Sequence, residues 1–240
     1  HRKPCERGLY YDSLIPATRR HSTITSVKFF CGDHLRNAVL EDIIALLKSG
    51  RVIAFPTDTA YGLGADPFNA NAVERIFEIK GREETKPILL LVSSVEMAES
   101  VCKPLRTFYD IARKFWPGPL TLVLPAATSL PARVTAATST IGLRWPAAAF
   151  ANELVARFGG PITATSANRS GLPSAVTAED VRTQLGDSID ALIDGGVLPS
   201  RTGSTVLDLT VDPPILVREG PVSFQTLSEF LNGRIRRRAA

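Results

Sequence analysis

Apolar residues recur at helical spacing in several segments of the chain. In residues 35–48, Leu35, Val39, Ile43 and Leu46 fall on one face of a helix, and Gly50 follows. This spacing predicts an amphipathic helix that ends before the glycine. The same pattern predicts further helices near residues 70–80, 94–101, 105–115, 150–158, 177–184 and 223–231.

Short apolar runs between these helices predict buried strands. The runs lie at residues 52–55, 88–92, 121–124, 141–144, 161–165, 189–193, 204–209 and 215–218. Strands alternate with helices along most of the chain, but the last strands follow one another directly. This order favours a mixed α/β (α+β) sheet over a purely parallel one. Because no repeat or linker interrupts residues 30–232, we expect a single domain.

Basic residues gather at the two ends of the chain. The net charge is +4, and both residues 1–26 and residues 234–240 are rich in arginine. We therefore expect a basic, irregular N-terminal arm (1–26), a globular domain (27–233) and a basic C-terminal tail (234–240). Such termini would bind RNA weakly through salt-sensitive phosphate contacts. The competing interpretation is a solvated terminus without a ligand.

Several protein classes are disfavoured by what the sequence lacks. The three cysteines form no CxxC pair, and the three histidines lie outside any motif. No HExxH, GxSxG or Walker sequence is present, which disfavours protein-bound zinc and a hydrolytic triad. The apolar runs are too short to span a bilayer. We expect a cytoplasmic protein in a reducing compartment without a membrane partner.

Two cationic segments suggest anion binding. Lys80, Arg82 and Lys86 lie within seven residues at a predicted helix end, which suits polyphosphate but also suits the helix dipole. Arg144 ends a strand before a proline, which suits a carboxylate or a plain salt bridge. Hydroxyl- and glycine-rich turns at 56–64 and 164–171 could bind phosphate or ribose, or serve only as turns.

Taken in series, these segments resemble the YrdC family of L-threonylcarbamoyladenylate synthases, in its short form. The matching stretches, within residues 35–222, are PTDTAYGLG, KGR, WPGPLT, TIGLRWP, PITATSANRSG, DGG, GSTV and LVREG. The resemblance implies a twisted mixed sheet with a deep basic groove. It also implies synthesis of threonylcarbamoyl-AMP and pyrophosphate from L-threonine, bicarbonate or CO₂, and ATP, for modification of tRNA. An RNA-binding module or a carbamoyl-handling relative of the same fold is the alternative.

The resemblance also implies residue roles. Lys80, Arg82 and Arg144 would be the catalytic cations. The L-threonine site would comprise Thr59, Leu91, Arg144, Ala164 and Ser204. The ATP site would comprise Arg82, Lys86, Thr140, Ser166, Asn168, Ser174 and Arg218. Leu91 stands where some members carry a histidine. Mg²⁺ would enter with ATP, without a protein-bound metal or organic cofactor, and the partner would be the transferase machinery that modifies tRNA with the product.

The sequence alone generates a prediction about Arg82. We expect Arg82→Ala to lower ATP-dependent pyrophosphate release about 10²- to 10⁴-fold, because two charge-assisted hydrogen bonds to phosphate would be lost. Arg82→Lys should rescue only part of the rate, since an ammonium group lacks the bidentate fork. A folded Arg82→Ala protein with the wild-type rate would show that the cation serves only the helix end.

Overall fold

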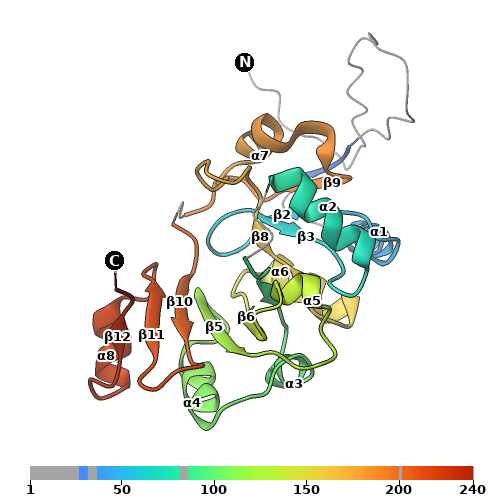
Figure 1. Cartoon of the computed structure of the whole chain (residues 1–240). Helices are drawn as coiled ribbons and strands as arrows, with labels where there is room; N and C mark the ends of the chain where they lie inside the picture. Colours follow the sequence, from blue (N-terminus) through green and yellow to red (C-terminus); the bar gives the residue numbers. More distant parts are fainter. Residues whose placement is uncertain (1–26, 32–36, 82–85, 200–201, 240) are drawn as a thin grey trace.

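The computed structural model describes residues 27–31, 37–81, 86–199 and 202–239. Over these residues two mixed β-sheets are flanked by α-helices (Figure 1). The α/β class with a mixed arrangement of strands is confirmed. The sequence predicted one sheet, and the structure divides the strands between two.

The first sheet has five strands in the order β1–β9–β2–β3–β8. The pairs β1–β9 and β9–β2 are parallel, whereas β2–β3 and β3–β8 are antiparallel. In that order, the strands are Lys28–Cys31, Ala191–Asp194, Ile53–Phe55, Gly62–Gly64 and Thr165–Ser166.

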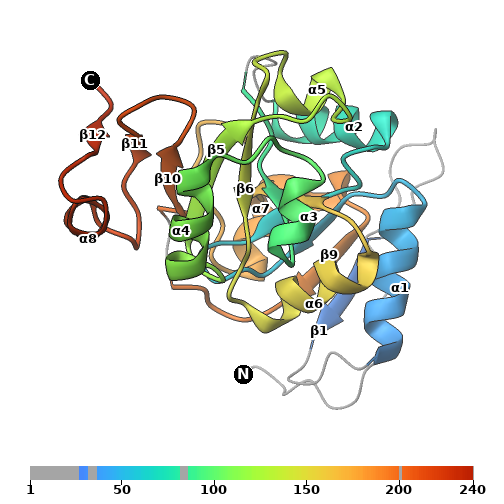
Figure 2. The ribbon, with the colours of Figure 1, turned by 90° about the horizontal axis from the view of Figure 1, so that it is seen from below.

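Helices cover both faces of the first sheet. Ile53 and Ile193 face one apolar cluster, formed with α1 (Asn37–Lys48) and α6 (Ala149–Phe158). Those two helices pack against each other (Figure 2). Ala54 and Leu192 belong to the other cluster, with α2 (Ala70–Lys80) and α7 (Ala178–Leu185), which the 3₁₀ turn Gly186–Ser188 follows. The strand alternation therefore buries apolar side chains on both sides.

The second sheet has seven strands in the order β12–β11–β10–β5–β6–β4–β7. Parallel and antiparallel neighbours alternate across it, starting from the parallel β12–β11 pair. In that order, the strands are Arg236–Arg237, Ile215–Arg218, Thr205–Asp208, Leu120–Pro125, Thr140–Arg144, Leu90–Leu91 and Ile162–Thr163.

Only one face of the second sheet is packed into the core along β5 and β6. Leu120, Leu122 and Leu124 are fully buried in the main cluster, as are Ile141 and Leu143. The intervening residues of both strands point to the opposite face, because successive side chains alternate. The helices of this half are α3 (Val95–Glu99), α4 (Arg106–Phe115), α5 (Ala132–Thr135) and α8 (Phe224–Phe230).

Between β7 and β8, a single residue carries the chain from one sheet to the other. Ala164 stands between β7 of the second sheet and β8 of the first. Its backbone N–H donates to Leu89 O at 2.9 Å, while the preceding Thr163 N–H donates to Ala65 O at 3.0 Å. The single strand expected over 161–165 is thus two short strands that serve different sheets.

The helix starts follow the capping signals in the sequence. Asn69 caps α2, Ser223 caps α8, and Thr177 with Asp180 forms a capping box at α7. Sequence periodicity missed four short elements, namely β1, β3, α5 and β12. The last of these extends the sheet beyond residue 233, so part of the expected tail pairs with β11. The arm expected over 1–26 lies outside the described residues.

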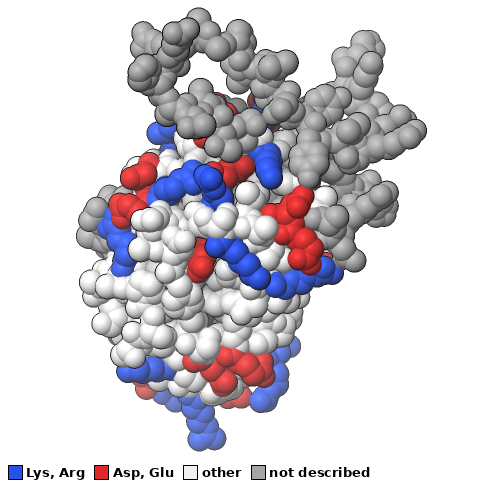
Figure 3. Space-filling view, turned by 90° about the vertical axis from the view of Figure 1, so that its right-hand side faces the viewer, with Lys and Arg blue, Asp and Glu red and all other residues white. Residues whose placement is uncertain are grey.

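Surface charge on one face is mixed. Figure 3 shows Lys and Arg interspersed with Asp and Glu there, outside the residues drawn in grey. Within the described ranges, no helix is both long and apolar enough to cross a lipid bilayer.

Leu122 tests the packed face of the second sheet. We expect Leu122→Ala to lower the free energy of unfolding by about 2–5 kcal/mol, because it leaves a cavity between the sheet and its helices. Leu172→Ala is the matched control, since that side chain is 50% exposed. Urea denaturation of both variants measures the difference. Equal stability of the two variants would contradict the packing described here.

Candidate functional site

A cleft of about 620 Å³ opens over the unpacked face of the second sheet. β5 contributes Thr121 and Val123 to it, and β6 contributes Thr140, Gly142 and Arg144. These are the strand positions that alternate with the buried leucine and isoleucine residues. The first sheet contributes the other wall through the β2–β3 loop and β8. The cleft therefore lies where the two sheets meet.

Most of the residues that the sequence assigned to a site converge on this cleft. Ten of them line it, namely Thr59, Lys86, Leu91, Thr140, Arg144, Ala164, Ser166, Ser174, Ser204 and Arg218. Two others, Lys80 and Asn168, are buried and are not among the lining residues. Arg82 lies outside the described residues.

Arg144 is the most deeply buried cation of the cleft. It ends β6 with only 4% of its surface exposed. Its Nε donates to Gly118 O at 3.2 Å, its Nη1 donates to Thr59 Oγ1 at 3.0 Å, and its Nη2 donates to Asp58 Oδ1. Burial lowers the pKa of Arg144, and the charge of Asp58 opposes that shift. The guanidinium is thus held in one orientation by three partners.

The loop that carries Asp58 is organised by threonine hydroxyls. Thr57 Oγ1 donates to Ala60 O at 2.7 Å and accepts from Thr59 N at 3.2 Å. The two threonine side chains lie 3.2 Å apart, between their hydroxyl oxygens. The TDT sequence therefore forms a compact turn that presents hydroxyls and one carboxylate towards Arg144.

Ser204 and Arg218 form a second polar wall. Ser204 Oγ lies 2.7 Å from Thr121 Oγ1. Arg218 donates through Nε and Nη2 to Ser204 O, at 2.9 and 2.8 Å. The pKa of Arg218 is lowered, first by desolvation and then by the positive charge of Arg144. The two arginines therefore raise the positive potential of the same cleft.

Two glycines allow the loops of this wall to approach closely. Gly203 has φ +73°, and a Cβ there would lie 3.0 Å from Arg218 Nη2. A Cβ on Gly220 would lie 2.7 Å from Thr205 N. The Thr205 hydroxyl joins the same loops, because it donates to Val222 O at 2.7 Å and accepts from Gly220 N at 3.0 Å. A side chain at Gly203 would crowd Arg218, and one at Gly220 would clash with the backbone of residues 203–205.

Lys80 does not line the cleft, but it binds the backbone of a segment that does. Its Nζ donates to Ser166 O and, at 2.8 Å, to Asn168 O. Asn168 Nδ2 in turn donates to Arg169 O at 2.8 Å and Leu172 O at 2.7 Å. The lysine and the asparagine thus hold the loop that carries Ser166. This position favours a structural role for Lys80 over direct contact with a ligand.

Tyr61 fixes another part of the rim. Its hydroxyl donates to Gly196 O and accepts from Gly195 N, both at 2.9 Å. Burial raises the pKa of Tyr61 to about 12, so the hydroxyl stays protonated at physiological pH. The DGG segment therefore contributes through its backbone, by anchoring the β2–β3 loop.

Several residues at the site were assigned no role in the sequence analysis. Asp58 and Thr57 belong to a matched motif, yet neither was assigned a role. Thr121 could have been found from strand alternation, since a polar residue between Leu120 and Leu122 must face away from the core. Gly118 contributes only a backbone carbonyl, for which side-chain chemistry gives no signal.

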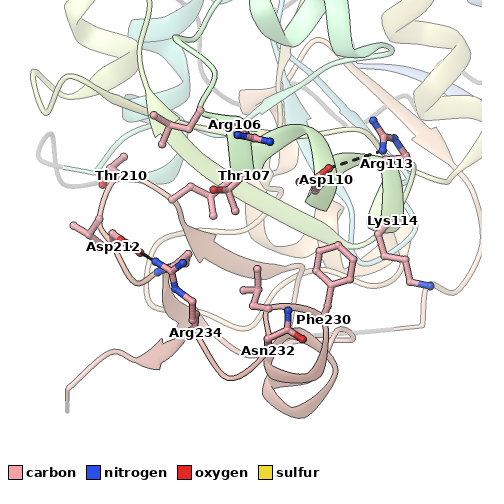
Figure 4. Close-up of a pocket in the computed structure, with 15 residues that line it drawn as sticks. Arg106, Thr107, Asp110, Arg113, Lys114, Thr210, Asp212, Phe230, Asn232 and Arg234 are labelled. Carbon is pink, nitrogen blue, oxygen red and sulfur yellow. Dashed lines mark hydrogen bonds and ion pairs between the residues drawn. The ribbon is translucent and has the colours of Figure 1, made fainter.

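A second cleft, larger at about 1000 Å³, lies on α4 beside the end of α8 (Figure 4). Two of its cations face carboxylates, with Arg113 against Asp110 at 3.8 Å and Arg234 against Asp212 at 3.1 Å. None of the residues assigned from the sequence lines it. The smaller cleft is the candidate site, because the buried Arg144, two further cations and several hydroxyls converge there. Over the described residues, no three His, Cys, Asp or Glu side chains gather in a metal-binding arrangement.

The chain matches known proteins over most of its length. The family model Sua5/YciO/YrdC, described as "Telomere recombination", matches residues 45–220. A Pyrococcus abyssi protein named threonylcarbamoyl-AMP synthase is 40% identical over 191 residues, which are 79% of this chain and 56% of that protein. A Coxiella burnetii protein of the same name is 36% identical over 171 residues, covering 70% of this chain and 91% of that protein.

A solved structure supports the same relationship. It is Pyrococcus abyssi Sua5 complexed with L-threonine, with a TM-score of 0.81 and 38% sequence identity. The match covers 86% of this chain and 61% of that one. The chain thus spans little more than half of the Pyrococcus protein and nearly all of the Coxiella protein.

Replacing Lys80 tests whether its hydrogen bonds to the Ser166 and Asn168 carbonyls stabilise the protein. We expect Lys80→Met to lower the free energy of unfolding by about 2–4 kcal/mol, because two buried carbonyls lose a charged donor. Lys48→Met, at an exposed position in the last turn of α1, should leave stability unchanged. Urea denaturation measures both variants. Unchanged stability in Lys80→Met would contradict the structural role.

Proposed function

Because the chain belongs to the Sua5/YciO/YrdC family, we propose that its cleft makes threonylcarbamoyl-AMP and pyrophosphate from L-threonine, bicarbonate or CO₂, and ATP. The observation that carries this proposal is the convergence of ten assigned residues on one cleft. They come from segments far apart in the chain, so their meeting is a property of the fold. Their chemistry suits anions, because three of them are cations and five carry hydroxyls. The cations are Lys86, Arg144 and Arg218, and the hydroxyls belong to Thr59, Thr140, Ser166, Ser174 and Ser204.

The amino-acid half of the cleft surrounds Arg144. Its guanidinium binds the carboxylate of threonine, and the hydroxyls of Thr59 and Ser204 lie on the lining of the same space. Ala164 and Leu91 supply small and apolar surface for the methyl group. Discrimination against serine then depends on that one methyl group, which contributes about 1–3 kcal/mol.

The nucleotide half takes the triphosphate. Lys86 is exposed at the cleft, and Arg218 lies across it on β11. Ser166 and Ser174 come from the loop that Lys80 supports, and Thr140 comes from β6. Arginine and lysine stabilise the charge that develops on transferring phosphoryl groups. Arg82, expected here from the sequence, lies outside the described residues, as does the neighbouring segment up to residue 85.

The reaction needs no nucleophile from the protein. The amine of threonine adds to CO₂ with loss of a proton, or condenses with bicarbonate with loss of water, and forms a carbamate. An oxygen of the carbamate then attacks the α-phosphorus of ATP while the bond to the β-phosphate oxygen breaks. Pyrophosphate leaves with the electron pair of that bond. Holding the reactants together is worth about 7–11 kcal/mol of the barrier. The cations of the cleft stabilise the negative charge on the phosphates.

The remaining components follow from this chemistry. Mg²⁺ enters as part of the ATP substrate, bound to its phosphates. The product is consumed by the transferase machinery that modifies tRNA, and the protein works in the cytoplasm where that machinery and ATP are available. Direct contact with tRNA would be weak and salt-sensitive, through the arginines near the C-terminus.

Pyrophosphate release tests the proposal. The protein should release pyrophosphate only when ATP, L-threonine and bicarbonate are all present, and labelled bicarbonate should appear in an adenylate. Release without threonine would contradict the proposed substrate. Absence of release together with RNA binding would favour the RNA-binding alternative, and turnover of carbamoyl phosphate in place of bicarbonate would favour the carbamoyl-handling one.

Arg218 provides a prediction with a matched control. We expect Arg218→Ala to lower the rate about 10²-fold, because a charged donor to phosphate contributes about 1.5–3 kcal/mol. Arg113→Ala, an exposed arginine of α4 outside this cleft, should keep the wild-type rate. Steady-state kinetics with varied ATP separates binding from turnover. Equal rates in the two variants would contradict the assignment of Arg218 to the nucleotide site.

A further inference from the structure

Asp58 carries an oxygen that nothing in the described chain satisfies. Its Oδ1 accepts from Arg144 Nη2, but its Oδ2 is buried and has no hydrogen-bond partner. A buried polar atom without a partner is destabilising, and more so when the group is charged. Its chain neighbours Thr57 and Thr59 both line the cleft, and its own side chain keeps 15% of its surface exposed. A ligand can therefore supply the partner after a small rotation of the carboxylate.

The guanidinium of Arg144 also has N–H groups without a hydrogen-bond partner in the described chain. It has five N–H groups in total. Three of them have partners, which are Gly118 O, Thr59 Oγ1 and Asp58 Oδ1. One N–H therefore remains on each terminal nitrogen. Two donors in one plane match the two oxygens of a carboxylate.

The Asp58 carboxylate and the Arg144 guanidinium, each with hydrogen-bonding capacity to spare, carry opposite charges and lie side by side. An α-amino acid carries its carboxylate and its amino group on the same carbon, so it presents an acceptor and a donor at the same short spacing. None of the described residues that line the cleft is acidic. Asp58 is thus the carboxylate placed to meet an amino group beside Arg144.

We propose that Asp58 recognises the α-amino group of the substrate, with Oδ2 accepting one of its N–H groups while Arg144 binds the carboxylate. This inference rests on the proposed function and names the group that makes the site specific for an amino acid. The contact survives carboxylation, because the carbamate nitrogen keeps one hydrogen. Asp58 also offsets the charge of Arg144, so that the pair accepts a zwitterion in preference to a plain acid.

The test compares two ligands by isothermal titration calorimetry. L-Threonine and 3-hydroxybutyrate share the carboxylate, the hydroxyl and the methyl group, and they differ in the α-amino group. We expect wild-type protein to bind threonine at least about 10-fold more tightly, as one charge-assisted hydrogen bond allows. Equal affinities for the two ligands would overturn the inference without any variant.

The variant Asp58→Asn sharpens the comparison, because it keeps the shape and removes the charge. We expect the preference for threonine over 3-hydroxybutyrate to fall about 10- to 100-fold. Asp110→Asn, an exposed carboxylate of α4, should keep the wild-type preference, and circular dichroism checks the fold of both variants. If Asp58→Asn weakens both ligands equally, Asp58 only positions Arg144 and the inference fails.

The same titrations separate this inference from the proposed function. Wild-type protein that binds neither ligand would contradict both. Wild-type protein that binds threonine, with a preference that Asp58→Asn leaves unchanged, would contradict only the role of Asp58.

Discussion

A guanidinium held away from water has to be neutralised and hydrogen-bonded at once, and the architecture around Arg144 follows from that requirement. The partners come from the β2–β3 loop and from the loop before β5, which are distant in sequence. The first sheet supplies Asp58 and Thr59, whereas the second supplies Arg144 itself. The ion pair therefore joins the two halves of the molecule at the cleft. Removing either partner would leave a buried charge and loosen that junction.

The second sheet shows how a core and a binding surface arise from the same strands. In β5 and β6 the leucine and isoleucine residues face the helices, and the positions between them face the cleft. Small residues such as Gly142 leave room there, while Thr121 and Ser204 pair their hydroxyls. The packed face stabilises the sheet, so residues on the other face can be polar and can contact a ligand. This division explains why the cleft is polar although its frame is apolar.

Much of this could be predicted from the sequence, for reasons that are local. Helix α2 follows from apolar spacing between the Asn69 cap and Gly81, and most cleft residues lie in motifs that resemble a known family. The rest depends on contacts between distant segments. A lysine has the same chemistry whether it faces phosphate or two backbone carbonyls, so Lys80 was placed in the site. The division at Ala164 depends on which strands pair, and no local pattern shows it.

The single-residue passage between the sheets at Ala164 has a mechanical consequence. The sheets are linked there by two strands of two residues each, β7 and β8. A change in the angle between the sheets would therefore alter the width of the cleft directly. A ligand that contacts Arg144 on one sheet and Ser166 on the other would bridge this joint. When such a ligand occupies the cleft, amide hydrogen exchange should slow in both sheets together, including in strands that do not contact the ligand.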